Sequence, residues 1–221
     1  MKNHLEYNKT DPAYDYAQQI SLGPWTSYSY LHDPTHLLFV LSRYKFCAKM
    51  LKGRKNVLEV GCGDGFGIPL VAQVVDYVTG IDLDKKIISS NIKRLRDFSN
   101  ISFKELDMLK EIPSGKFDGI YAIDVIEHIP TDKTKRFIQN IQSSLKDSGI
   151  CIVGTPNITS DKYASRQSKL HHINLQSYQS LLLLMQKYFT NVFMFGMNDE
   201  VVHTGYPPMC HYLFAVGVGK K

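Results

Sequence analysis

The 221-residue sequence contains no long apolar run. A membrane-spanning helix needs about 20 consecutive, mostly apolar residues, and no stretch of this sequence approaches that length. The first residues, 1–7, are polar, so the sequence also lacks the apolar centre of a secretion signal. These two absences predict a cytoplasmic protein with no part inserted in a membrane.

Cysteine and clustered basic charge are also scarce. Cys47, Cys62, Cys151 and Cys210 lie far apart and form no Cys-x-x-Cys pair, which argues against a structural zinc site and a disulfide framework. The net charge is +5 and the pI is about 8.9, but the lysines are dispersed and form no basic arm of the kind that binds nucleic acid. With 43% hydrophobic residues, the chain is typical of one globular domain.

Short apolar runs alternate with amphipathic stretches along most of the chain. The predicted strands are 57–60, 77–82, 101–105, 117–123, 149–154, 191–195 and 212–218, and the predicted helices are 34–51, 68–75, 85–98, 133–145 and 177–187. This alternation predicts an α/β fold: a Rossmann-like, doubly wound, seven-stranded and mostly parallel sheet. The last two strands have no crossover helix between them, so the C-terminal strand should run antiparallel. We expect residues 1–52 to form an N-terminal cap and helix of the same domain, and residues 53–221 to form its main part.

A glycine-rich loop follows the first predicted strand. It reads Gly61-Cys62-Gly63-Asp64-Gly65, and glycine allows both a tight turn and the close approach of a ligand to the backbone. The second predicted strand ends in Asp82, 21 residues after Gly61, where a carboxylate can accept hydrogen bonds from the two hydroxyls of a ribose. A G-x-G pattern alone is weak support. Its placement between a strand, a helix and a second strand ending in an acid predicts an adenosine-type cofactor.

The acids around the loop bear on which cofactor it holds. A dinucleotide site usually reads G-x-G-x-x-G and places a pyrophosphate at a helix N-terminus. Here Glu59 and Asp64 flank the glycines, and two carboxylates are unfavourable near a pyrophosphate but favourable near a cation. The pattern therefore favours a cationic adenosine cofactor over a dinucleotide.

The segment 57–65, V-L-E-V-G-C-G-D-G, resembles the first motif of the class I S-adenosylmethionine-dependent methyltransferases, whose cofactor carries a sulfonium and an ammonium group. Segments 78–82, 106–108 and 117–130 are similar to the second, third and fourth motifs. Within this family the chain resembles the small-molecule branch and the ubiquinone-pathway O-methyltransferases. The resemblance implies that S-adenosyl-L-methionine is bound, with Asp107 on the adenine amino group, a backbone contact from Met108, and Arg43 on the cofactor's carboxylate. The full set of implied cofactor contacts is Arg43, Glu59, Gly61, Gly63, Asp82, Leu83, Asp107, Met108 and Ile123.

Histidines after the fourth and fifth predicted strands are candidates for the chemistry. A neutral histidine can remove the proton of an acceptor hydroxyl, so His128 and His172 are candidate catalytic bases. In some family members an acid-x-x-Glu-His segment and a later histidine bind a divalent ion, which implies a second possibility, a magnesium or manganese site. The residues in question are Asp124, Glu127, His128, His171 and His172. Asp124 departs from those members, which more often have glutamate there, and purely structural histidines are the third reading.

The sequence thus predicts a methyltransferase that moves a methyl group to a hydroxyl or amine of a small molecule. An RNA methyltransferase and a non-catalytic cofactor-binding subunit are the alternatives. Trp25, Tyr28 and Tyr30 precede the first long helix, where aromatic rings can cover a sulfonium by cation–π attraction or simply fill space between cap and core. His203 is a further acceptor-side candidate. The acceptor, the choice between O- and N-methylation, and the oligomeric state leave no signature in the sequence.

Overall fold

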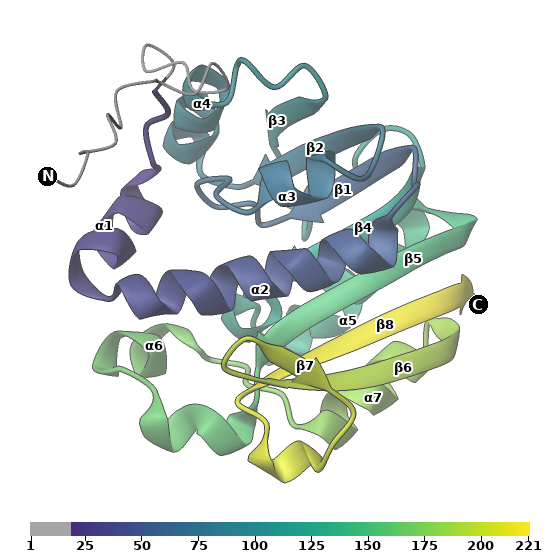
Figure 1. Cartoon of the computed structure of the whole chain (residues 1–221). Coiled ribbons are helices and arrows are strands. Elements are labelled where there is room, and N and C mark those ends of the chain that lie inside the picture. The colour runs from purple at the N-terminus through teal and green to yellow at the C-terminus, as the bar shows by residue number, and fades with distance from the viewer. Residues whose placement is uncertain (1–18) are drawn as a thin grey trace, which may run out of the picture.

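An eight-stranded sheet runs through the part of the chain that the computed structural model describes, residues 19–221 (Figure 1). Its order is β3-β2-β1-β4-β5-β8-β6-β7. The strands are β1 (Asn56–Val60), β2 (Tyr77–Asp82), β3 (Ile101–Glu105), β4 (Phe117–Ile123), β5 (Leu145–Pro156), β6 (Phe189–Asn198), β7 (Val201–His203) and β8 (Tyr212–Lys220). The first five pair in parallel, while β8 pairs antiparallel with both β5 and β6, and β7 pairs antiparallel with β6.

Helices cover both faces of this sheet. They are α1 (Pro24–His32), α2 (Pro34–Leu51), α3 (Ile68–Ala72), α4 (Lys85–Arg94), α5 (Thr134–Ser144), α6 (Arg166–His171) and α7 (Tyr178–Gln186), with 3-10 turns η1 (Ile126–His128), η2 (Thr131–Lys133), η3 (Ile158–Tyr163) and η4 (Pro207–Met209). In Figure 1, α2 crosses in front of the sheet and α5 and α7 lie behind it. Neighbouring strand residues point to opposite faces, so Val57 packs in the core under α2 and α3, and Leu58 packs in the core with α5 and α7.

The predicted fold class is confirmed, and the bounds of α2, β2, β3 and β4 agree with the sequence prediction. The sheet has one strand more than predicted, because β7 is only three residues long and has no readable apolar alternation. The short helices α1 and α6 were also missed. In α1 the buried residue is Thr26, so the helix has no apolar stripe that a periodicity could reveal.

Local capping fixes the turns that carry the site. The Asp84 side chain accepts hydrogen bonds from the backbone N–H groups of Lys86 and Ile87, which begins α4 directly after β2. Such a cap is worth about 1 kcal/mol. The cap holds the turn that follows Asp82, the last residue of β2, at the carboxyl edge of the sheet.

The strand order reverses between β1 and β4. In an open parallel sheet, ligands bind beyond the carboxyl ends of the strands at such a switch point. Gly61 follows β1 and Asp124 follows β4, so these two residues mark the expected crevice. The first 18 residues of the predicted cap lie outside the described residues. Within 19–221, none of the helices combines the length and the apolarity that crossing a membrane requires.

Candidate active site

The glycine loop adopts backbone conformations that glycine favours. Gly61 has φ of 70° and Gly63 has φ of 51°. A Cβ atom at Gly61 would lie 2.5 Å from Val125 Cγ2, and one at Gly63 would lie 2.7 Å from Trp25 Cζ3. Both positions therefore require glycine for conformation and for space.

Asp82 ties this loop to the end of β2. Its Oδ2 accepts a hydrogen bond from the Gly63 N–H at 3.0 Å, and its Oδ1 accepts one from the Asp84 N–H at 3.0 Å. Asp82 borders a cavity of about 340 Å³, which we term the β2–β3 cavity and which lies within the ~300–1,000 Å³ range of small-molecule sites. Five of the predicted cofactor residues line it: Gly61, Asp82, Leu83, Asp107 and Met108. The structure thus gathers most of the predicted cofactor set around one cavity.

A second cavity of about 280 Å³, the loop cavity, adjoins the first. Gly61 borders both cavities, and Gly63 and Ile123, two further predicted cofactor residues, line the second. Trp25 and His128 also border both. The two cavities thus share part of their walls, at the ends of β1 and β4.

Helix α1 is anchored on the glycine loop through Asp64. The Thr26 N–H donates to Asp64 Oδ2 at 2.8 Å, and the Thr26 hydroxyl donates to Oδ1 at 3.0 Å. This contact sets the indole of Trp25 against Gly63. Tyr28 stacks on His32 and, like Tyr30, is exposed outside the two cavities. Of the three aromatic residues expected over the cofactor, Trp25 occupies that position.

Glu59, also predicted as a cofactor residue, lines neither of these cavities. Its side chain is buried beneath the loop, where its two carboxylate oxygens accept hydrogen bonds from the hydroxyls of Tyr44 at 2.6 Å and Tyr121 at 2.9 Å. Burial raises the pKa of Glu59 to about 8, although both hydrogen bonds favour the ionised form. Glu59 is therefore placed to support the loop rather than to touch a cofactor. Asp64 is hydrogen-bonded to Thr26, so in this structure neither Glu59 nor Asp64 presents a free carboxylate to a cation. The sequence shows these acids but not the residues that bond to them.

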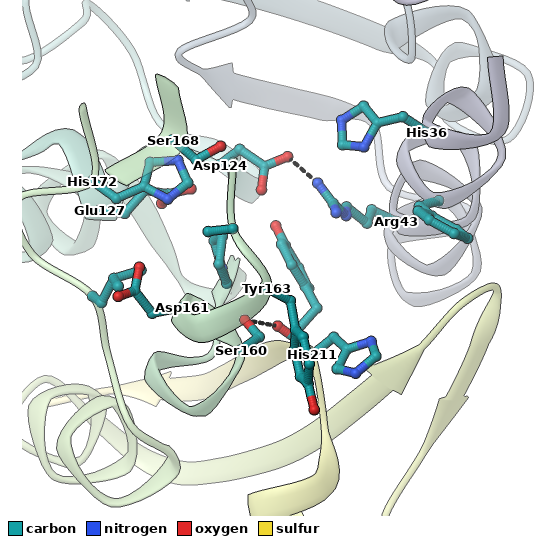
Figure 2. Close-up of a pocket in the computed structure, with 15 residues that line it drawn as sticks. His36, Arg43, Asp124, Glu127, Ser160, Asp161, Tyr163, Ser168, His172 and His211 are labelled. Atoms are coloured by element: carbon teal, nitrogen blue, oxygen red, sulfur yellow. Dashed lines mark hydrogen bonds and ion pairs between the residues drawn. The ribbon is translucent and has the colours of Figure 1, made fainter. Parts of the chain in front are cut away.

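A third cavity of about 400 Å³, the rim cavity, opens beside the other two (Figure 2). Arg43 lines it, with Nη1 2.6 Å from Asp124 Oδ2 and the guanidinium carbon 4.1 Å from the centre of the Tyr212 ring. Arg43 was expected on the cofactor's carboxylate, which stays a prediction. In this structure its guanidinium is paired with Asp124 and borders a cavity separate from the glycine loop.

Asp124 is where the three cavities meet. It follows β4 with φ of 57°, an uncommon conformation for a residue other than glycine. It borders the β2–β3, loop and rim cavities. Its salt bridge with Arg43 therefore lies between the two predicted cofactor cavities and the rim cavity.

Three of the five predicted metal-binding residues come together. One ligand atom each from Glu127, His128 and His172 lies within 4.8 Å of the others. His171 is excluded because its exposed ring hydrogen-bonds to Gln167 at 2.8 Å. Asp124 is excluded because it pairs with Arg43. The sequence could not show which of the two adjacent histidines, His171 or His172, lies beside Glu127 and His128.

The two predicted catalytic histidines lie on either side of the junction between cavities. His128 borders the β2–β3 and loop cavities and His172 borders the rim cavity, with ring centres 5.1 Å apart. His128 Nδ1 lies 3.1 Å from the His171 carbonyl oxygen and therefore donates to it, which leaves Nε2 as the acceptor. Burial and the neighbouring His128 lower the pKa of His172, so its ring is neutral at pH 7.

One residue of the rim cavity, Tyr212, carried no readable signal. Tyr212 was predicted only as the start of a strand, yet β8 pairs Tyr212 with Pro156 beside the end of β5 and so brings it to the site. The segment around η3 and α6 lines the rim cavity and contributes Ser160, Asp161, Tyr163, Ala164 and Ser168 to it. His203, by contrast, lies on β7 outside the three cavities and hydrogen-bonds to Asn198 and Gly205.

The sequence of this chain is similar to those of known methyltransferases. Residues 30–192 match the family of the methyltransferase domain. The chain is 29% identical over 158 residues to the ubiquinone biosynthesis O-methyltransferase of Rickettsia akari, covering 66% of this chain and 60% of that protein. It spans 52–60% of the length of the first curated relatives that it matches.

Solved structures share the fold. The N-methyltransferase NodS from Bradyrhizobium japonicum in complex with S-adenosyl-L-homocysteine superposes with a TM-score of 0.59 at 18% identity, over 85% of this chain and 86% of that one. The methyltransferase domain of bacterial CtHen1 gives 0.68 at 18% identity, over 82% and 99%. The match over residues 30–192 shows that the chain belongs to the methyltransferase domain family.

Proposed function

We propose that this protein binds S-adenosyl-L-methionine along the β2–β3 and loop cavities and transfers its methyl group to a small molecule held in the rim cavity. The observation that carries the proposal is the gathering of Gly61, Asp82, Leu83, Asp107 and Met108 around one cavity that shares part of its wall with the loop cavity. The sulfonium supplies an activated methyl group, so the protein has to provide position and electrostatics.

Each of these residues has a defined task in the proposal. The Asp82 carboxylate accepts the ribose hydroxyls while its bond to the Gly63 N–H keeps the loop in place. Asp107 accepts from the adenine amino group. The Trp25 ring packs against Gly63 of the loop, and the face of such a ring attracts a cation such as the sulfonium. The anchoring of α1 on Asp64 supports our proposal that residues 1–52 belong to the same domain as 53–221.

His172 is the proposed base for an acceptor hydroxyl. It borders the rim cavity, and its lowered pKa leaves the ring neutral and able to take a proton at pH 7. His128, 5.1 Å away between ring centres, lies on the cofactor side and is the alternative base. General base catalysis typically contributes about 10²–10⁴-fold to a rate.

A divalent ion is a second candidate at the same place, favoured by the Glu127, His128 and His172 cluster. A carboxylate and two imidazoles suit manganese or magnesium, and such an ion lowers the pKa of a bound hydroxyl. Calorimetric titration with MnCl₂ tests this directly: the wild-type protein should bind and a His128→Ala, His172→Ala double variant should not. Equal heats for both proteins, with activity that survives chelation, would rule the ion out.

The cofactor site can be tested with the chain's own tryptophan. The sequence contains one, Trp25, which borders both cofactor cavities, so binding of S-adenosyl-L-homocysteine should change its fluorescence. Asp82→Ala should abolish the change. Glu105→Ala is the matched control, because Glu105 is the exposed strand partner of Asp82 on β3. An Asp82→Ala protein that binds the compound as tightly as the wild type would contradict the proposed site.

The alternative functions give different results in the same preparation. An RNA methyltransferase would label RNA with the donor's methyl group and lose affinity for RNA as salt is added. A non-catalytic subunit would bind S-adenosyl-L-homocysteine but methylate nothing. The small molecule is preferred here because the rim cavity, at about 400 Å³, has the size of a small-molecule site.

A further inference from the structure

Four buried polar atoms within residues 19–221 lack a hydrogen-bond partner, and all four belong to residues that line the rim cavity. They are Arg43 Nε, Asp124 Oδ1, Glu127 Oε1 and the Tyr212 hydroxyl. Buried polar groups in native proteins are nearly always paired, because leaving one unpaired costs about 1–3 kcal/mol. Their gathering at one cavity indicates that a ligand supplies the missing hydrogen bonds.

These side chains are held in position without the ligand. The Glu127 side chain is fully buried, and its other oxygen accepts a hydrogen bond from the Thr155 hydroxyl at 3.0 Å. Tyr212 is 3% exposed and lies under the guanidinium of Arg43. Its hydroxyl is near Asp124, although no hydrogen bond of ordinary geometry joins them. The cavity wall is therefore built in advance.

The charges at this end of the cavity cancel. Arg43 and Asp124 lie 2.6 Å apart and neutralise each other. A ligand with its own net charge would compete with that pair, whereas a neutral ligand can use the unpaired atoms of both partners. The pair therefore favours a neutral ligand.

The unpaired atoms also specify which groups the ligand carries. Arg43 Nε can only donate, the Asp124 oxygen accepts, and the Tyr212 hydroxyl can do either. An ammonium group would satisfy Asp124 and leave Arg43 Nε unpaired, and a carboxylate would do the reverse. A hydroxyl donates and accepts, so hydroxyls satisfy every atom in the set.

The polar groups lie on more than one side of the cavity. Figure 2 shows Arg43 and Asp124 on one side and Asp161 across from them. At the mouth, the exposed ring of Tyr163 lies edge-to-face with His211, with ring centres 5.9 Å apart. A flat diol presents its hydroxyls at a single edge. A saturated ring with hydroxyls around its perimeter reaches several walls and offers a C–H face to the aromatic ring.

We propose that the methyl acceptor is a neutral polyhydroxylated ring, a monosaccharide or cyclitol unit, bound in the rim cavity by Arg43, Asp124, Glu127 and Tyr212. This inference rests on the proposed function and names its acceptor class. In the reaction, the acceptor hydroxyl nearest His172 forms an O–C bond to the methyl carbon. The C–S bond breaks with its electron pair left on sulfur, and the hydroxyl proton passes to the ring nitrogen of His172. The product is a methyl ether.

The test measures transfer of a labelled methyl group from S-adenosyl-L-methionine to a panel of probes. The polyols are the methyl glycosides of glucose, galactose and mannose, and myo-inositol; the controls are catechol, benzylamine and benzoate. At least one polyol should be methylated in preference to all three controls. Preference for benzylamine, benzoate or catechol overturns the proposal, and so does a protein that binds S-adenosyl-L-homocysteine yet methylates no polyol. Absence of that binding in the wild type would instead refute the proposed function.

Two substitutions distinguish binding of the acceptor from binding of the cofactor. Tyr212→Phe removes one hydroxyl from the rim cavity and should raise the KM for the accepted polyol about tenfold while leaving the affinity for S-adenosyl-L-homocysteine unchanged. Tyr77→Phe, at the far end of β2, is the matched control. Arg43→Lys should behave like Tyr212→Phe. If it instead weakens the cofactor analogue and not the polyol, Arg43 grips the cofactor and the acceptor assignment is wrong.

Discussion

Replacement of Glu59 by glutamine should flatten the dependence of stability on pH. Glu59 is fully buried with two tyrosine hydroxyls on its carboxylate, and burial raises its pKa from 4.5 to about 8. Between these two values the folded protein keeps a proton that the unfolded chain has released. Stability is therefore greatest below pH 4.5 for this group and is lost as the pH rises through about 8.

The magnitude follows from the same linkage. One such group lowers the free energy of unfolding by about 1.4 kcal/mol per pH unit, or about 5 kcal/mol across the whole interval. Burial also raises the pKa of Glu127 to about 8, which steepens the wild-type slope, whereas the lowered pKa values of His36 and His172 act in the opposite direction. Glutamine can still accept from one tyrosine and donate to the other. The slope of the Glu59→Gln protein should thus differ from that of the wild type by about 1.4 kcal/mol per pH unit.

Urea unfolding at pH 5.5, 6.5 and 7.5 measures the slope directly. For a chain of this size, 1 kcal/mol corresponds to about 2–4 °C, so melting temperatures should show the same trend. Glu105→Gln removes an exposed carboxylate from β3 and should keep the wild-type slope. Parallel lines for the wild type and Glu59→Gln would refute the reasoning, since Glu59 would then be ionised in the folded state.

Three further changes test the loop, its anchor and the base. Gly63→Ala should cost more stability than Gly53→Ala, by about 1 kcal/mol or more in thermal unfolding, because both have positive φ but only the first Cβ meets another side chain. Thr26→Val removes one hydrogen bond to Asp64, so S-adenosyl-L-homocysteine should bind several-fold more weakly by fluorescence and chymotrypsin should cleave α1 faster at its aromatic residues; unchanged values would show that the anchor is dispensable. His172→Gln should lower kcat about 100-fold and abolish the fall in rate that the wild type shows at acid pH, whereas a retained acid limb would assign that proton to another group.

Local patterns predicted much of the fold. The bounds of α2 were readable because Pro34 begins it and Gly53 follows its end, and β2 was readable because an apolar run stops at Asp82. That Gly61 and Asp82 lie at one cavity could be predicted from their places along the chain. Gly61 and Asp82 each follow a strand directly, and parallel strands bring their ends together at one edge.

The other features of the site depend on contacts between distant parts of the chain. The pair of Arg43 and Asp124 joins residues 81 apart, and no local pattern specifies it. The two tyrosine partners of Glu59 come from α2 and β4, and no local pattern around Glu59 shows them. Tyr212 reaches the site only because β8 inserts beside β5, a pairing that the order of strands along the chain does not reveal.

The segment that carries η3 and α6 is suited to replacement as one unit. Its two ends lie together, because Asn157 bridges to Gln176 and the Ile158 N–H donates to the Gln176 carbonyl at 2.9 Å. The Asn157 side chain is fixed to the carbonyls of Pro207 and Cys210. Residues 158–175 form part of the rim cavity and lie apart from the glycine loop. Under the proposed function, a graft between these two pinned ends that keeps His172 would change which molecules are methylated, while the residues around the β2–β3 and loop cavities stay unchanged.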